Sequence, residues 1–133
     1  MPMFKLGIIL ITIGLLIAST YIINYQQIDT TLKVVIPSIG VNQSVNFEGI
    51  DNGVYYDRGV LFGHRTTHGS PFFNLDKIVI GDEVIFNNTI YIVDKIHIED
   101  NTYTIKPEPN YIYLVTCTPI GSTAQRIIVE AKT

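Results

Sequence analysis

The chain begins with a long apolar run and continues as short apolar runs separated by turn residues. Leu6 to Ile23 covers about 18 residues without a charge, enough for one helix across a hydrocarbon core of about 30 Å. Lys5 and the N-terminal amine precede this run, which predicts a cytoplasmic N-terminus and an exported remainder. A cleaved signal peptide is the alternative. It is disfavoured because the run is long and more apolar residues follow Ala18-Ser19-Thr20.

This pattern divides the chain into three parts. Residues 1–24 are predicted to be an uncleaved signal-anchor, that is, a transmembrane helix, and residues 25–31 a short polar linker. Residues 32–133 form one exported domain, which is long enough to bury a core without disulfides or metal ions. The predicted location is therefore the cell membrane, crossed once, with the domain on the extracellular side.

The exported part alternates between β-branched runs and turn residues, as all-β domains do. Asn87-Asn88 suits a two-residue hairpin turn, and Ile90 to Glu99 then alternates like a long half-buried strand or a bulged pair of strands. Residues 69–78 predict one short helix or 3₁₀ turn that packs its aromatic side chains on the sheet. Further strands are predicted at residues 32–36, 39–45, 59–63, 83–86, 111–116 and 126–131. About seven or eight short strands with one or two short helices predict a closed, antiparallel-rich β-barrel, with a β-sandwich as the runner-up.

Charge and cysteine content narrow the function. The net charge is −3 and the basic residues form no patch, so a nucleic-acid partner is not expected. Cys117 is the only cysteine of the sequence. An exported domain with one cysteine cannot form an internal disulfide, so Cys117 is either a small buried side chain or a reactive nucleophile.

A reactive thiol needs a base or a positive charge nearby, because the thiolate is the nucleophile and a free thiol has a pKa of about 8.5. Arg126 begins the last predicted strand. If this strand neighbours the strand of Cys117, the guanidinium returns to the thiol and could hold a carbonyl or an oxyanion. His64 follows a third strand and could protonate a leaving amine. His97 lies within the long alternating strand, and a structural role is predicted for it.

Three ordered motifs resemble the sortase family. Thr116-Cys117-Thr118-Pro119, with Arg126 at the head of the last strand, resembles the sortase signature. Gly63-His64-Arg65 resembles the surroundings of the sortase catalytic histidine, and Ile36-Pro37-Ser38-Ile39-Gly40-Val41 looks like the first strand of that family. The resemblance covers nearly the whole exported domain, and the residues around His64 are most similar to a class E sortase.

The resemblance implies an eight-stranded β-barrel with cysteine transpeptidase activity. It implies that Cys117 attacks a C-terminal sorting motif of the Leu-Pro-x-Thr-Gly type and forms a thioester. His64 would protonate the leaving amine and then activate an incoming one, while Arg126 would bind substrate and stabilise the oxyanion. Thr116 and Thr118 are implied as substrate-binding residues. The implied partners are secreted proteins with a sorting motif and an amine of the cell envelope or of a pilin-like protein, and no cofactor or metal is implied.

Other functions remain open at this point. A related hydrolase would give the thioester to water, and a non-enzymatic envelope β-domain would leave the thiol inert. His64 and His68 have the spacing of a helical metal pair, with Cys117 as a third ligand, but the flanking glycines disfavour a helix there. For an acidic partner of His64, Asp57 and Asp76 are candidates only by their proximity in sequence.

Overall fold

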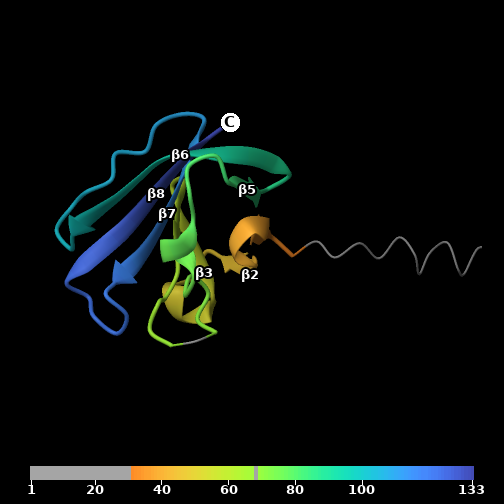
Figure 1. Ribbon diagram of the computed structural model, residues 1–133. Coiled ribbons are helices and arrows are strands. Elements are labelled where there is room, and N and C mark those ends of the chain that lie inside the picture. The colour runs from red at the N-terminus through yellow and green to blue at the C-terminus, as the bar shows by residue number, and fades with distance from the viewer. Residues whose placement is uncertain (1–30, 68) are drawn as a thin grey trace, which may run out of the picture. The chain divides into compact units, whose positions relative to one another are not determined.

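Eight strands close into a barrel in the computed structural model, which describes residues 31–67 and 69–133 (Figure 1). The strands are β1 (Lys33–Ile36), β2 (Val41–Asn46), β3 (Val54–Asp57), β4 (Val60–Phe62), β5 (Glu83–Phe86), β6 (Thr89–Asp100), β7 (Tyr111–Thr118) and β8 (Gln125–Lys132). The 3₁₀ helices of this part are η1 (Pro37–Ile39), η2 (Ile50–Asn52) and η3 (Leu75–Lys77). The order around the barrel is β1-β2-β3-β4-β7-β8-β6-β5, and β5 pairs with β1 to close it.

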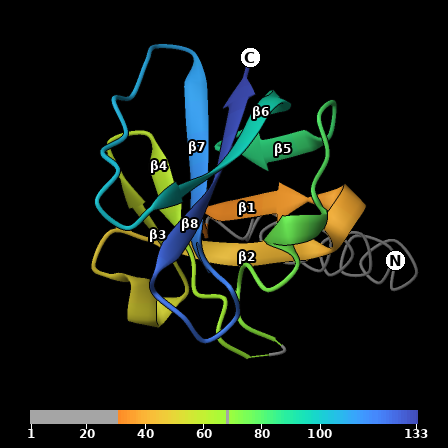
Figure 2. The same ribbon diagram turned by 60° about the vertical axis from the view of Figure 1, so that its left-hand side comes forward.

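The predicted all-β barrel is confirmed, and its pairing is mostly antiparallel. Two pairs, β2–β3 and β4–β7, are parallel. The second of these matters for the site because it aligns the C-terminal ends of β4 and β7. Figure 2 shows β7 and β8 side by side, with the β6–β7 connection running along the outside of the barrel towards β4. The predicted transmembrane run, Leu6 to Ile23, lies outside the described residues, and within them no helix has the length and hydropathy to cross a membrane.

The β5–β6 hairpin has the turn that the sequence predicts. Asn87 and Asn88 both adopt left-handed backbone angles, with φ of 50° and 59°, as a type I′ turn requires. The alternating run after them is one bulged strand, whose register shifts between Val93 and Lys95. The bulge changes which side chains face the interior, because the period of a strand is two.

The barrel interior is filled by apolar side chains from every strand. Fully buried examples are Val34, Val54, Leu61, Val84, Val93, Leu114 and Val129. Burying one such side chain stabilises the fold by about 1.5–3 kcal/mol relative to leaving it exposed. A second cluster lies on the outer face of β4, β7 and β8, and it consists of Val60, Tyr113, Val115 and Ile128. Ile105 of the β6–β7 connection packs against this outer cluster, so the connection is held against the barrel.

Candidate active site

Cys117 and Arg126 lie directly opposite each other in the antiparallel β7–β8 pair. Their neighbours Thr116 and Ile127 are buried, so the half-buried Cys117 and Arg126 side chains occupy the outer face. Nη1 of Arg126 donates to Sγ of Cys117 at 3.1 Å, and also to the Thr123 carbonyl at 3.3 Å. The sulfur therefore has a charged N–H donor beside it. The strands are therefore neighbours as the sequence reasoning required, and the guanidinium reaches the thiol.

His64 is brought to the same end of the barrel by the parallel β4–β7 pair. The N–H of Gly63 donates to the Val115 carbonyl at 3.1 Å, so the chain still follows β7 one residue before His64. The His64 ring is 39% exposed, and its Nε2 lies 3.0 Å from Oδ1 of Asp51. No hydrogen bond joins His64 to Cys117 within residues 31–67 and 69–133. Its Nδ1 is thus the ring nitrogen available for proton exchange while Asp51 accepts from Nε2.

Gly63 is required where the segment of His64 leaves β4. A Cβ at this position would lie 2.6 Å from Cδ2 of Phe72, a distance at which the ring would have to move. Phe72 is fully buried, and its N–H donates to the His64 carbonyl at 3.1 Å. The ring and this hydrogen bond fix the backbone of His64 against the core.

Asp51 is the carboxylate that sequence reasoning missed. The two candidates named from sequence proximity have other partners: Asp57 pairs with Arg58 at 3.0 Å, and Asp76 pairs with Arg65 at 3.1 Å. Asp51 lies on η2, where the sequence signals only a turn. Its side chain is 93% exposed, so the ion pair with a protonated His64 contributes little to stability, on the order of 1 kcal/mol or less.

The two threonines that flank the cysteine have different surroundings. Thr116 is 2% exposed, and its hydroxyl donates to the Gly63 carbonyl at 2.6 Å. It therefore ties β7 to the segment before His64, and its role in substrate binding stays a prediction. Thr118 is half-buried, and its hydroxyl accepts from Nη1 of Arg65 at 3.3 Å. Its role in substrate binding stays a prediction.

Arg65 is a buried cation that sequence reasoning did not single out. It is 6% exposed, and three partners surround its guanidinium. Nε donates to the Phe73 carbonyl at 3.1 Å, Nη1 to the Thr118 hydroxyl at 3.3 Å, and Nη2 lies 3.1 Å from Oδ2 of Asp76. A buried charge is tolerated only with such partners. Arg65 thus connects the segment after β4 to the end of the strand that carries the thiol.

We expect Arg65→Lys to lower the melting temperature by several degrees. A lysine ammonium cannot reproduce the planar fork, so part-buried acceptors lose partners at a cost of about 1–3 kcal/mol. For a domain of about 100 residues, each kcal/mol shifts the midpoint by about 4–8 °C. Thermal unfolding followed by circular dichroism measures this. Arg58→Lys is the matched control because Arg58 is 87% exposed, and equal melting temperatures for both variants would contradict the assignment.

An open pocket of about 450 Å³ lies on the outer face beside Arg126. Its apolar residues from the barrel are Val60, Phe62, Val115 and Ile128, and the β6–β7 connection contributes Tyr103, Thr104, Ile105 and Pro107. This size suits a small ligand or a short peptide segment. Asp57, Arg58 and Arg126 also line it, so the surface beside the thiol combines apolar side chains with charged ones.

Both ends of the β6–β7 connection are tied to the barrel. Thr102 donates to Oδ1 of Asp100 from its hydroxyl at 2.5 Å and from its N–H at 2.9 Å, and these bonds lower the pKa of Asp100. At the other end the N–H of Glu108 donates to the Tyr113 hydroxyl at 3.2 Å. Burial raises the pKa of Tyr113, so the phenol remains neutral at physiological pH. The β6–β7 connection, which lines one side of the pocket, is thus held by hydrogen bonds at both of its ends.

The zinc set of His64, His68 and Cys117, already disfavoured by the sequence, cannot be assembled from the described residues. His68 lies outside the described residues. Within the described ranges, no group of three His, Cys, Asp or Glu side chains is arranged to hold a metal ion. His97 lies away from the thiol, on β6, and contacts carboxylates.

The fold and this arrangement define a closed β-barrel with a cysteine and an arginine on its outer face and a histidine at the same end of the barrel. A family model described as a sortase domain matches residues 52–133, more than half of the chain. The chain therefore belongs to the sortase family.

Two curated relatives are similar over the same part. Sortase SrtE2 of Streptomyces coelicolor is 32% identical over 85 residues, and sortase SrtE1 of the same organism is 33% identical over 88 residues. These matches cover 52% and 54% of this chain but only 34% and 25% of the relatives. They are consistent with the resemblance to class E, and the matched segment spans about a third or less of each relative.

Solved sortase structures share the fold. Sortase A of Listeria monocytogenes has a TM-score of 0.69 at 22% identity, covering 78% of this chain and 87% of that one. Sortase C1 of Streptococcus suis has a TM-score of 0.62 at 26% identity, covering 77% and 71%. Barrel architecture is therefore the shared property at this level of identity.

Proposed function

We propose that this protein is a membrane-anchored cysteine transpeptidase. It cleaves a C-terminal sorting motif of the Leu-Pro-x-Thr-Gly type, or a relative such as Leu-Ala-x-Thr-Gly, in a secreted protein. It then joins the new C-terminus to an amine of the cell envelope or of a pilin-like protein. In this proposal the catalytic residues are Cys117, His64 and Arg126, and the catalytic domain is extracellular behind an N-terminal anchor with a cytoplasmic N-terminus.

The contact between Nη1 of Arg126 and Sγ of Cys117 carries the proposal. It pairs the only thiol of the chain with a cation that lines a pocket of apolar and charged side chains. An apolar residue of the motif would lie on the surface of Val60, Phe62 and Val115, which leaves the scissile bond beside the thiol. Membership of the sortase family supports the same reaction class.

The chemistry balances with these side chains alone. The Cys117 thiolate attacks the carbonyl carbon of the scissile amide, and the guanidinium of Arg126 stabilises the oxyanion that forms. The C–N bond then breaks, a thioester remains, and His64 gives a proton to the departing amine. An incoming amine attacks the thioester, the thiolate leaves, and His64 takes the proton of that amine.

Product analysis with and without an added amine tests the proposal. The full chain in detergent is incubated with a fluorescent sorting peptide, and mass spectrometry identifies the products. We expect the peptide to be cleaved and, when a glycine peptide is present, joined to it. If the peptide is cleaved but the products are the same with and without each added amine, a hydrolase is favoured. If no motif variant is cleaved, a non-enzymatic domain is favoured.

A further inference from the structure

The row of polar outer-face residues does not end at Arg126. In the antiparallel β6–β8 pair, Glu99 lies directly opposite Arg126, on the side away from Cys117. The next outer-face pairs place His97 opposite Ile128 and Lys95 opposite Glu130. A carboxylate opposite a guanidinium on neighbouring strands is a favourable ion pair. The register therefore offers Arg126 a second partner that competes with the thiol.

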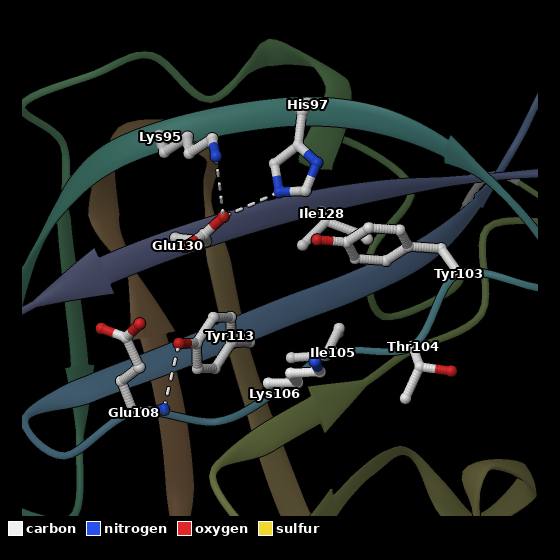
Figure 3. Close-up of a pocket in the computed structure, with 10 residues that line it drawn as sticks. All are labelled: Lys95, His97, Tyr103, Thr104, Ile105, Lys106, Glu108, Tyr113, Ile128 and Glu130. Carbon is white, nitrogen blue, oxygen red and sulfur yellow. Dashed lines mark hydrogen bonds and ion pairs between the residues drawn. The ribbon is translucent and has the colours of Figure 1, made fainter.

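Glu99 is bound to His97 instead. Nδ1 of His97 lies 2.9 Å from Oε1 of Glu99, and Nε2 lies 2.8 Å from Oε2 of Glu130. Figure 3 shows the ring between Glu130 and Tyr103, with Lys95 beside it on β6 and directed to the same Glu130 carboxylate. The His97 side chain is 15% exposed and that of Glu99 36%, so the contact between them is only partly shielded from water.

The His97 ring lies between two carboxylates. Each of its nitrogens is within hydrogen-bond distance of one of them, and an ionised carboxylate can only accept. Glu130 has a second partner in Lys95, whose Nζ lies 3.9 Å away, whereas Glu99 has no side-chain partner besides His97 in the described part of the chain.

Arg126 is correspondingly left to the thiol. Within residues 31–67 and 69–133 it forms no ion pair with a carboxylate, and its two hydrogen bonds go to Cys117 and the Thr123 carbonyl. A guanidinium paired with Glu99 would keep its charge, but the carboxylate would offset its field at the sulfur and take N–H donors away from Sγ. The position of the Arg126 guanidinium therefore depends on whether Glu99 pairs with His97 or with Arg126.

We propose that His97 is a positioning residue, which binds Glu99 and so keeps it from pairing with Arg126. Removing the imidazole releases Glu99 to its cross-strand partner and draws the guanidinium from Cys117. The consequence for catalysis rests on the proposed function, but the position of the guanidinium does not. The thiol itself reports that position, because a neighbouring cation increases its reactivity.

The test compares alkylation of Cys117 by iodoacetamide in four forms of the full chain at one neutral pH. We expect His97→Phe to slow alkylation about three- to five-fold, the effect of one partly exposed charge pair. The double variant His97→Phe/Glu99→Gln should return to within about two-fold of the unmodified chain, because a neutral amide does not capture Arg126. His97→Phe/Glu130→Gln is the matched control and should stay slow, since Glu130 is not opposite Arg126.

Loss of folding cannot imitate this pattern, because all three variants lack the imidazole. If the phenylalanine series does not fold, the same comparison is made with His97→Gln. Equal rates with and without Glu99→Gln, or equal rescue by Glu130→Gln, overturn the proposal. A parallel assay of peptide cleavage by the unmodified chain separates the two proposals. The alkylation pattern without peptide cleavage supports the positioning role of His97 and contradicts the transpeptidase. Peptide cleavage without the alkylation pattern supports the transpeptidase and contradicts the positioning role.

Discussion

Replacing Cys117 with alanine is expected to abolish the covalent acyl-enzyme while leaving the barrel folded. The chain has no second thiol, so no thioester can form elsewhere. The side chain is half-buried on the outer face, outside the interior cluster, so removing one sulfur atom costs about 1 kcal/mol or less. Intact-mass spectrometry of the acid-quenched protein after mixing with a sorting peptide measures the adduct.

The control for this experiment is Ser122→Ala, a change in the β7–β8 connection that leaves the thiol in place. It should retain the full adduct, while Cys117→Ala shows none at any time point. Circular dichroism confirms that both variants melt near the unmodified chain. Peptide cleavage by the Cys117→Ala protein would show that the proposed nucleophile is wrong.

Local signals in the sequence were sufficient to predict most of the strands. The Asn87-Asn88 turn follows from backbone conformations that asparagine tolerates, and the alternation beyond it follows from the period of a half-buried strand. The strand Val54–Asp57 was not predicted, because only Val54 of its four residues is buried and it follows a turn directly. The parallel β4–β7 pair has no local signal, since its partners are about fifty residues apart in sequence.

The site shows the same division between local and long-range information. The closeness of Cys117 and Arg126 could be expected once their strands were assumed to be neighbours. The contacts of Asp51 and Arg65 could not, because they depend on how connections fold over the end of the barrel. Alternation along β7 indicates that Thr116 and Cys117 face opposite sides, but only the closed barrel shows which side is outer.

Arg126→Ala is expected to lower kcat/KM for the sorting peptide by about 10²–10³-fold, the usual effect of losing one oxyanion donor. Its guanidinium is the cation that contacts the sulfur within the described residues, and it also lines the pocket on the outer face. The melting temperature should change little, because the group is half-buried and pairs with no carboxylate there. Steady-state cleavage of the fluorescent peptide measures the loss, and Lys77→Ala is the control for removing a positive charge elsewhere.

Arg126→Lys separates the contribution of charge from that of geometry. Lysine keeps the positive charge as a compact ammonium but lacks the planar fork, so it cannot donate to Sγ and to a substrate oxygen at once. If charge at the thiol is the main contribution, Arg126→Lys will restore the rate of Cys117 alkylation and most of the peptide cleavage. If the fork is required, alkylation will recover while kcat remains low. A kcat/KM for Arg126→Ala within about three-fold of the unmodified chain would contradict any catalytic role of this side chain.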